Sequence, residues 1–450
     1  MRAPLAAIAS CSIGVLVSSA ALANDQGQPP ATSVLEVPGD YATIAEAVAA
    51  ANAGDTVLVG EGTWVEHMMI DKDIVLRASG AREATLIAGG SYYEGAPAGL
   101  TLEGVTPGCV IEGFTFSGFE HWAVKFTGDP VIRNCAFQSN GHNAMDWGNL
   151  RAVGLQGEGS PLITDCLFDR NSYLAHSGAN GSALFLANGS PRLENCTFTN
   201  NYTAGNCESW GGAACFHQCT IELVNCIFEY NAVEAGSCGG SALEAGGAIF
   251  ADGGSMTLSG CRFTGNQARS SNLYGVPKGG AISTSGVLHV AACVFSGNWA
   301  GSHGWCDTCF GSGGAISAVG GGTISDSRFL ENGASYTQWT WPAGQAINVD
   351  GGFAISNTSF CPDGSGNDAA IAGYFDEGED LVACWTCSDS GPCAETACAG
   401  DVDGDGDSDV TDLLAVLSAW GSDDDQVDLD ADGTIDIQDL LMLLDWYGSC

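Results

Sequence analysis

The stretch PRLENCTFTNN, residues 191–201, decides the fold of this 450-residue chain. It contains the pattern Cys-x-Phe-x-x-Asn, formed by Cys196, Phe198 and Asn201. A repeat of about 30 residues predicts one structural unit per copy, each stacked on its neighbours. The other copies, the last with Ser in place of Cys, are Cys135/Phe137/Asn140, Cys166/Phe168/Asn171, Cys226/Phe228/Asn231, Cys261/Phe263/Asn266, Cys293/Phe295/Asn298 and Ser327/Phe329/Asn332.

A second series of short segments has the same period and stays in phase with the first. Because two independent series keep phase over six repeats, chance does not explain the recurrence. Each segment begins with Gly and carries Ala two positions later: Gly181–Ala183, Gly211–Ala213, Gly246–Ile249, Gly279–Ile282, Gly313–Ile316 and Gly344–Ile347.

Within each repeat, apolar and polar residues alternate, as they do from Pro191 to Phe198. A period of two is typical of β-strands, and no helical stretch separates the copies. We therefore predict an all-β fold, a parallel β-solenoid of about nine coils. Cys, Phe, Ala and Ile should point inward and stack on the same residue type in the next coil. The Asn residues should occupy tight turns in the left-handed backbone region and bond to the adjacent coil, and the Gly pairs should form the opposite corner.

The composition restricts the class of partner. The chain has 13 Lys and Arg residues against 53 Asp and Glu residues, a formal net charge of −40. Such a surface repels phosphate backbones and anionic lipids, so nucleic-acid binding is not expected, and cations, above all calcium, are favoured. A hydrophobic fraction of 45% argues against disorder, and 64 Gly residues without a strict period of three exclude collagen.

Residues 1–23 are typical of a secretory signal peptide, with Arg2 before an apolar stretch and Ala21–Ala23 as the cleavage site. Residues 24–32 would then be a short linker. No later stretch reaches the ~18 consecutive apolar residues of a transmembrane helix, so no transmembrane segment is expected. The sequence therefore predicts an extracellular protein, with attachment to a bacterial cell surface as an option.

The combination of Gly-Gly-Ala-Ile with Phe-x-x-Asn resembles the repeat of polymorphic outer-membrane proteins. Residues 33–372 as a whole resemble the right-handed parallel β-helix superfamily that includes pectate lyases, and residues 37–66 resemble the N-terminal cap of pectate-lyase-like and pectinesterase-like chains. The resemblance implies a single-stranded, right-handed parallel β-helix with a helical N-terminal cap. Ile44, Val48 and Ala51 would lie on one face of the cap helix, and the first strand would follow it.

Loops of variable length follow the Asn turns and carry repeated aromatic residues. Two interpretations are open: the rings form a platform for the apolar faces of sugars, or they pack a core within the loops themselves. The candidate carbohydrate-binding residues are Trp147, Trp210, Trp299, Trp305, Trp339 and Trp341.

No local cluster matches a catalytic motif of the pectate-lyase-like families, so the catalytic residues stay unassigned. A solenoid can also assemble a site from several coils. If the chain is an enzyme, the resemblance implies a polysaccharide lyase or a glycosidase. The titratable loop residues available to such a site are Asp146, Glu208, Glu234, Glu244, Asp307, His142, His176 and His303.

Twenty cysteines suggest an oxidising compartment or metal sites. The six cysteines of the Cys-x-Phe-x-x-Asn repeat, from Cys135 to Cys293, are called the ladder cysteines. They are expected to be stacked, buried thiols. Residues 373–399 are expected to form a cysteine-containing linker. Cysteines in the loops are expected to form disulfides, although Cys306 and Cys309 also fit a redox pair or half of a zinc site; these loop cysteines are Cys207, Cys238, Cys306 and Cys309.

Residues 400–450 carry the strongest chemical motif in the chain. Two twelve-residue loops place oxygen ligands at positions 1, 3, 5, 7, 9 and 12, with Gly406 and Gly433 at position 6, where the chain must turn around an ion. Hard oxygen donors at this density select calcium, so the sequence predicts two Ca²⁺ ions. The expected ligands are Asp401, Asp403, Asp405, Asp407, Asp409, Asp412, Asp428, Asp430, Asp432, Thr434, Asp436 and Asp439.

Each loop precedes a short apolar helix, predicted over 413–420 and 440–446 and ended by glycine. A duplicated loop–helix pair with Asp at position 12 resembles a dockerin. Its flanking Cys398 and the terminal Gly-Ser-Cys resemble the variant on secreted planctomycete-type bacterial proteins. The resemblance implies a cohesin-like or cell-surface receptor protein as partner, contacted at positions 10 and 11 by Val410, Thr411, Ile437 and Gln438.

Together these features predict an extracellular β-helix protein that associates with carbohydrate through a loop face and is attached by a calcium-dependent dockerin-like module. The alternative is a polysaccharide-degrading enzyme carried on the same module.

Overall fold

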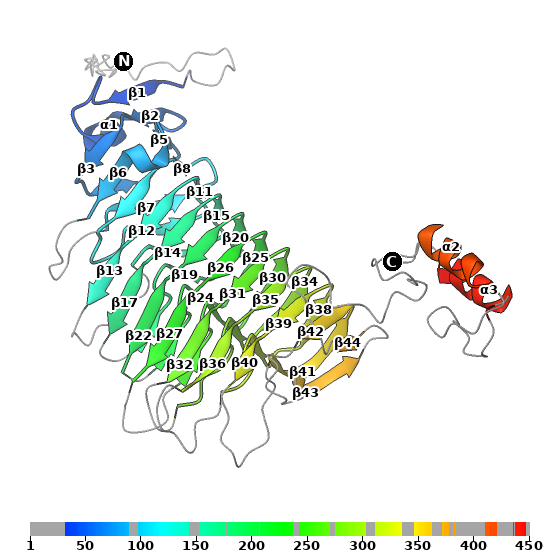
Figure 1. Ribbon diagram of the computed structural model, residues 1–450. Coiled ribbons are helices and arrows are strands. Elements are labelled where there is room, and N and C mark those ends of the chain that lie inside the picture. The colour runs from blue at the N-terminus through cyan, green and yellow to red at the C-terminus, as the bar shows by residue number, and fades with distance from the viewer. Residues whose placement is uncertain are drawn as a thin grey trace, which may run out of the picture.

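Figure 1 shows strands of the chain stacked side by side along one solenoid. The pairings between described strands are parallel and join segments one repeat apart, as in Phe198 with Phe228 and Tyr202 with Ala232. The predicted parallel β-solenoid is therefore confirmed. The computed structural model describes residues 32–89, 98–143, 153–175, 178–206, 208–236, 243–270, 275–302, 311–334, 346–361, 371–377, 381–383, 410–420, 435 and 437–446.

Three faces surround the core. Face 1 consists of β4 (Met68–Ile70), β7 (Leu100–Val105), β10 (Val124–Gly128), β14 (Leu155–Glu158), β19 (Leu184–Ala187), β24 (Ala214–His217), β29 (Ile249–Asp252), β33 (Ile282–Thr284), β37 (Ile316–Ala318) and the first part of β41 (Ile347–Ser356). Face 2 consists of β1 (Val34–Val37), β2 (Thr56–Val59), β5 (Val75–Ala78), β8 (Val110–Glu112), β11 (Val131–Arg133), β15 (Leu162–Thr164), β20 (Arg192–Glu194), β25 (Thr220–Val224), β30 (Ser255–Ser259), β34 (Val287–Ala291), β38 (Gly322–Ser325), the last part of β41 and β43 (Ile371–Glu377). Face 3 consists of β3 (Gly62–Trp64), β6 (Thr85–Ala88), β9 (Thr115–Ser117), β12 (Ala136–Gln138), β16 (Leu167–Asp169), β21 (Thr197–Thr199), β26 (Ile227–Glu229), β31 (Arg262–Thr264), β35 (Val294–Ser296), β39 (Arg328–Leu330), β42 (Thr358–Cys361) and β44 (Leu381–Ala383).

The segments between the Asn turn and the Gly corner, predicted as loops, contain strands of their own. They form two smaller sheets beside face 1. The first, the outer sheet, consists of β13 (Gly141–Asn143), β17 (Ser172–Ala175), β22 (Tyr202–Gly205), β27 (Ala232–Ala235), β32 (Gln267–Ser270), β36 (Trp299–Ser302) and β40 (Gly333–Ala334). The second, the corner sheet, consists of β18 (Gly178–Asn180), β23 (Glu208–Trp210) and β28 (Leu243–Ala245).

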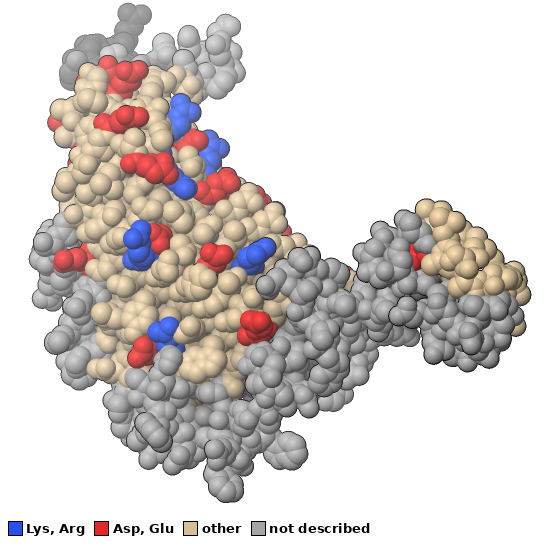
Figure 2. Space-filling view, in the orientation of Figure 1, with Lys and Arg blue, Asp and Glu red and all other residues tan. Residues whose placement is uncertain are grey.

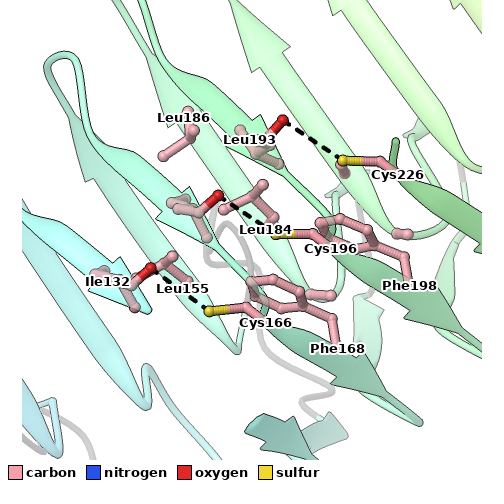
Figure 3. Close-up of a cluster of buried hydrophobic side chains, with 14 of the residues drawn as sticks. Ile132, Leu155, Cys166, Phe168, Leu184, Leu186, Leu193, Cys196, Phe198 and Cys226 are labelled. Atoms are coloured by element: carbon pink, nitrogen blue, oxygen red, sulfur yellow. Dashed lines mark hydrogen bonds between the residues drawn. The ribbon is translucent and has the colours of Figure 1, made fainter. Parts of the chain in front are cut away.

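Phenylalanine rings form a continuous stack inside the solenoid. Neighbouring rings lie 4.4 to 5.2 Å apart and within 11° of parallel. Figure 3 shows part of this interior, where the Cys196 thiol beside Phe198 donates to the carbonyl oxygen of Ile163 on face 2 at 3.4 Å. The inward stacking predicted for Phe and Cys is thus confirmed. The nine stacked residues are Phe116, Phe137, Phe168, Phe198, Phe228, Phe263, Phe295, Phe329 and Phe360.

The number of coils is close to the predicted nine. About eight turns, from β9 to β39, follow the repeat most regularly. Beyond them β42 carries the last stacked Phe, and β3, β6 and β44 complete the twelve strands of face 3. β43 and β44 pair with β41 and β42, so the sheets continue to Ala383.

A row of buried asparagines joins successive coils where face 3 meets the outer sheet. The Nδ2 of Asn201 donates to the carbonyl oxygen of Phe168 and to Oδ1 of Asn231, both at 2.9 Å. Its backbone N–H donates to the same Oδ1 at 3.0 Å. This set of bonds recurs along the row, and it confirms that the asparagines bond to the adjacent coil.

The left-handed backbone predicted for these asparagines is wrong. The residue before each of them has the positive φ instead, with values of 53° at Arg170, 55° at Asn200 and 55° at Tyr230. The physical reason is that the amide must point inward to reach both neighbouring coils, so the preceding residue makes the turn. The glycine corner is as predicted: Gly211 has φ +65°, and a Cβ on Gly212 would lie 2.0 Å from the carbonyl oxygen of Gly247.

Helix α1 (Ile44–Ala50) packs against β1, β2 and β4, and buries Ile44 and Val48 as predicted. Both carboxylate oxygens of Glu66 accept hydrogen bonds from the first backbone N–H groups of this helix, at 3.1 and 2.9 Å. The prediction that the first strand follows the helix is wrong. β1 precedes the helix and pairs with β2. Its inward alternation, Leu35 and Val37, covers only four residues and is therefore a weak signal in the sequence.

The remaining helices are the 3₁₀ helix η1 (Arg82–Ala84), α2 (Val410–Ser418) and α3 (Ile437–Trp446). Helices α2 and α3 contact each other around a small core of Val416, Ile435 and Leu443. Each begins three residues before its predicted start. Among the described helices, none has the length and apolar character required to cross a membrane.

Charged side chains are sparse on the solenoid face seen in Figure 2, with wide uncharged areas between them. By contrast, the sequence after Gly400 contains 15 Asp and no Lys or Arg. The acidic excess of the chain is therefore unevenly distributed, and the solenoid surface is less charged than the net charge suggests.

The asparagine row predicts a large loss of stability for Asn201→Leu. The substitution removes the two Nδ2 bonds and the Oδ1 that accepts from the backbone N–H and the Nδ2 of Asn171, so the buried N–H of Asn171 loses its partner. At about 1–3 kcal/mol for each unpaired buried group, we expect unfolding in urea, followed by circular dichroism, to show a loss of at least about 3 kcal/mol. Asn200→Gly, at the exposed neighbour with φ 55°, is the control and should change stability by less than about 1 kcal/mol. Equal losses in both variants would contradict the role of the row.

Candidate functional site

A cleft of about 160 Å³ opens on the outer side of face 1, beside the corner sheet. It is built from five strands of three successive coils. Its lining residues are Asn180, Phe185, Trp210, Cys215, His217, Phe250 and Asp252.

Strand alternation and register determine which side chains reach this cleft. In β24, Ala214 and Phe216 are fully buried in the core, so Cys215 and His217 point to the opposite side. The parallel register then places Phe185, Cys215 and Phe250 in one row. In the same way, it places His217 beside Asp252.

The cleft has an aromatic wall. The rings of Trp210 and Phe250 are stacked 5.4 Å apart at 17°. Phe185 and Cys215 are almost fully buried and form a small apolar cluster on the outer side of face 1, against which Phe250 packs. An aromatic surface of this kind contacts the C–H face of a sugar ring or another apolar ring.

Polar groups stand beside that wall. The Nδ1 of His217 lies 3.1 Å from Oδ2 of Asp252, and both side chains are about half exposed. The Oδ1 of Asn180 is buried and accepts no hydrogen bond. The cleft therefore offers a hydrogen-bond acceptor and a His–carboxylate pair next to apolar rings, which suits a ligand with one apolar face and polar edges.

A second cavity, of about 230 Å³, lies at the edge of the outer sheet. It is lined mainly by small residues together with Leu174, Asn206 and Glu234. The Tyr202 hydroxyl donates to Oε2 of Glu234 at 2.8 Å. Burial, and after it this carboxylate, raises the pKa of Tyr202, so the phenol stays a neutral donor. Among the described lining residues, the only titratable group, Glu234, is therefore already bonded within the protein.

The predicted site residues have different outcomes. Trp210 lines the cleft, whereas Trp299 belongs to β36 of the outer sheet, so these two tryptophans do not share a row. Glu208 is exposed on β23, and Glu234 belongs to the second cavity. Of the remaining predictions, these fall outside the described residues: Trp147, Trp305, Trp339, Trp341, Asp146, Asp307, His176, His303 and the side chains of His142 and Glu244.

Sequence reasoning missed His217, Phe250, Asp252 and Asn180. A signal for two of them was present. His217 follows Ala213 of the glycine–alanine series by four residues, and Asp252 follows Ala248 by the same interval. Alignment of the repeats on this series would have placed the two side chains at the same outward position of neighbouring coils.

The calcium loops lie almost wholly outside the described residues. Of the predicted ligands, Asp412 and Asp439 are described, and both are fully buried in the first turns of α2 and α3. Among the residues that the structure describes, no group of three or more His, Cys, Asp or Glu side chains is placed to hold a metal ion.

Cys109, Cys219 and all six cysteines of the ladder are free and buried. Burial raises the pKa of Cys109 to about 12 and that of Cys219 to about 11. It also raises the pKa of the Cys166 thiol well above its ordinary value. Because these thiols are buried, they act as small apolar spacers, as predicted.

The stacked coils and the cleft define the class of protein: a parallel β-solenoid with an aromatic cleft on one outer face. The family described as right-handed β-helix region matches residues 90–361. Because this is more than half of the sequence, the chain belongs to the right-handed β-helix family, and the expected handedness is confirmed.

Comparison with solved structures gives distant similarities. One is to pectin methylesterase PemA from Erwinia chrysanthemi, with 12% identity over 81% of this chain and 94% of that chain and a TM-score of 0.26. Another is to a mutant pectin methylesterase in complex with a hexasaccharide, with 12% identity, the same coverage and a TM-score of 0.28. A third is to polygalacturonase from Erwinia carotovora ssp. carotovora, with 12% identity over 82% and 98% of the two chains and a TM-score of 0.27. No curated protein matches the sequence.

The buried thiols predict slow chemical modification of the native protein. With pKa values of about 12 and 11, Cys109 and Cys219 stay protonated at pH 8, so a thiol reagent should label them and the ladder cysteines only after unfolding. In the unfolded chain a thiol ionises near pH 8.5. The raised pKa values of Cys109 and Cys219 therefore favour the folded state below that pH and lower the free energy of unfolding as the pH rises further. Peptide mapping after labelling, with and without denaturant, measures the extent to which each cysteine is labelled. Rapid labelling of Cys196 in the native protein would contradict the buried ladder.

Proposed function

We propose that the chain is an extracellular carbohydrate-binding β-helix protein that is attached or assembled through a calcium-dependent, dockerin-like module. The observation that carries the binding function is the stacked pair of Trp210 and Phe250 beside the unpaired Oδ1 of Asn180. A sugar ring places its C–H face on aromatic rings and its hydroxyls on polar groups. The extracellular location rests on the signal-like residues 1–23.

Calcium binding is proposed for residues 400–450. A fully buried carboxylate is costly unless it meets a cation or several hydrogen-bond donors. Asp412 and Asp439 are fully buried carboxylates at the last position of each loop, where the motif supplies a calcium ligand. These residues fit Ca²⁺, which would neutralise the loops and allow α2 and α3 to pack.

The surface of α2 and α3 supports a protein partner for this module. Large apolar side chains are exposed at equivalent positions of both helices, 27 residues apart. Val410 and Ile437, which were predicted to contact the partner, belong to this set, whereas position 11 contributes the polar Thr411 and Gln438. The matched pairs are Val410 with Ile437, Leu414 with Leu441, and Leu417 with Leu444.

A second candidate function is cleavage of the polysaccharide at the same cleft. The observation that favours it is the His217–Asp252 contact of 3.1 Å, because a carboxylate orients a histidine for proton transfer. In this case the aromatic wall would position the chain and His217 would act as the general base or acid.

Trp210→Ala tests the cleft. Loss of the ring should weaken binding of oligosaccharides about tenfold or more in calorimetry or glycan-array titration. The reason is that stacking of a ligand ring on an aromatic side chain contributes about 1–3 kcal/mol. Trp299→Ala, in the outer sheet, is the matched control and should bind like the parent protein. Equal loss in both variants, or no binding of any glycan by the parent, would reject the proposal.

The same titrations distinguish the two candidates. Release of reducing or unsaturated ends by the parent, abolished in His217→Ala, would establish cleavage and replace the binding function. Binding without release of ends supports the proposal as stated.

The calcium module is tested in the full chain with Asp412→Asn combined with Asp439→Asn. The amides remove two negative ligands, so calcium affinity should fall by at least about tenfold, and the calcium-induced change in fluorescence of Trp420 and Trp446 should disappear at low millimolar calcium. Asp423→Asn combined with Asp424→Asn, between the two loops, is the control with the same change of charge. Unchanged calcium binding in the double variant would reject the ligand assignment.

A further inference from the structure

We propose that the cleft on face 1 takes a neutral sugar, whose hydroxyls donate hydrogen bonds, and discriminates against uronic-acid polymers. The proposal rests on the carbohydrate-binding function above and adds the chemical class of the ligand.

Two unpaired acceptors, one in the cleft and one on the neighbouring strand, define what the ligand must supply. Oδ1 of Asn180 lines the cleft, is buried and has no hydrogen-bond partner. Gln156 continues the row of Phe185, Cys215 and Phe250 by one strand, and its Oε1 is likewise buried without a partner. Both atoms need a donor. A sugar hydroxyl donates one, whereas an ionised carboxylate has no proton to donate.

The charge of the lining points in the same direction. Among the described lining residues, Asp252 is the only carboxylate and neither Lys nor Arg occurs. An anionic sugar placed against the Trp210–Phe250 wall would bring its carboxylate near Asp252 in a partly dehydrated site. Two like charges at such a distance repel each other, and the described lining contains no Lys or Arg to compensate for them.

The nearest described cations along these strands lie outside the cleft. Lys125 is one strand beyond Gln156 in the same row, and its ammonium group lies 4.8 Å from the centre of the Trp122 ring. Lys278 pairs with Ala245, two strands from Trp210, which is about 10 Å at the usual strand spacing. Over such a distance, salt screens most of the attraction between exposed charges.

The size of the cleft limits how much of a polymer it encloses. At about 160 Å³ it is smaller than the roughly 300–1,000 Å³ of sites that enclose drug-sized ligands. It therefore accommodates about one sugar ring, with neighbouring rings outside. A uronic-acid ring keeps its ring hydroxyls and differs at its carboxylate, so the charge of that carboxylate beside Asp252 is what separates neutral from acidic polymers.

The test compares two polymers that share a backbone: oligogalacturonate, and the same oligosaccharide after reduction of its carboxyl groups to alcohols. Titration calorimetry of the full chain should show at least tenfold tighter binding of the reduced, neutral form, with little dependence on salt. Stronger or equal binding of oligogalacturonate would overturn the inference and leave the carbohydrate-binding function intact. If neither form nor any neutral glycan binds, the proposed function falls and the inference falls with it.

Two variants separate the hydrogen-bond and charge contributions. Asn180→Leu removes the acceptor and should weaken binding of the neutral oligosaccharide about fivefold. Asp252→Asn removes the negative charge of the cleft lining and should improve oligogalacturonate binding. The ratio of the affinities for the neutral and the acidic polymer should therefore fall. Trp299→Ala should leave both affinities unchanged, since Trp299 belongs to the outer sheet. An unchanged preference in Asp252→Asn, together with unchanged neutral binding in Asn180→Leu, would refute the mechanism of selection.

Discussion

The hydrogen-bonded row of asparagines fixes the register of the coils, and the rest of the structure depends on that register. Each amide donates to the preceding coil and to the following amide. Since side chains alternate between two sides of a strand, a slip of one residue would turn the Phe stack outward. Because the amides are buried, slipped arrangements would leave unpaired donors in an apolar interior, which is more costly than the loss of packing alone.

The same register creates the cleft. No turn or helix brings Phe185, Cys215 and Phe250 together; they occupy equivalent positions in successive coils. His217 and Asp252 meet for the same reason, although 35 residues separate them in sequence. A solenoid thus places a row of functional side chains at a constant spacing, and a site can arise by substitution at outward positions without any change in the core.

These relations explain what the sequence could and could not predict. Inward positions repeat their residue type, so Cys196, Phe198 and Asn201 identified the coils. The backbone conformation at Asn201 was assigned to the wrong residue because both asparagines at 200 and 201 favour turns, and only burial distinguishes them. The outward positions repeat no residue type, so Asp252 and His217 can be found only by aligning the repeats on the glycine–alanine series. The strands of the outer sheet were expected to be loops, because their segments vary in length between repeats.

Carboxylates have opposite roles in the two parts of the protein. In the solenoid, the described acidic groups are mostly at the surface, and the interior is stabilised by rings, thiols and amides. In the C-terminal helices, a carboxylate of each loop is buried in a segment without basic residues, so folding there is expected to depend on a cation. The first part should therefore resist chelators, whereas the second should not.

The most direct measurement of the central functional claim is a crystal structure of the protein soaked with a neutral hexasaccharide. The account requires density for one sugar ring against Trp210 and Phe250, with a hydroxyl within hydrogen-bond distance of Asn180 Oδ1. Density only at another part of the surface, with the Asn180 amide rotated to bond within the protein, would contradict it.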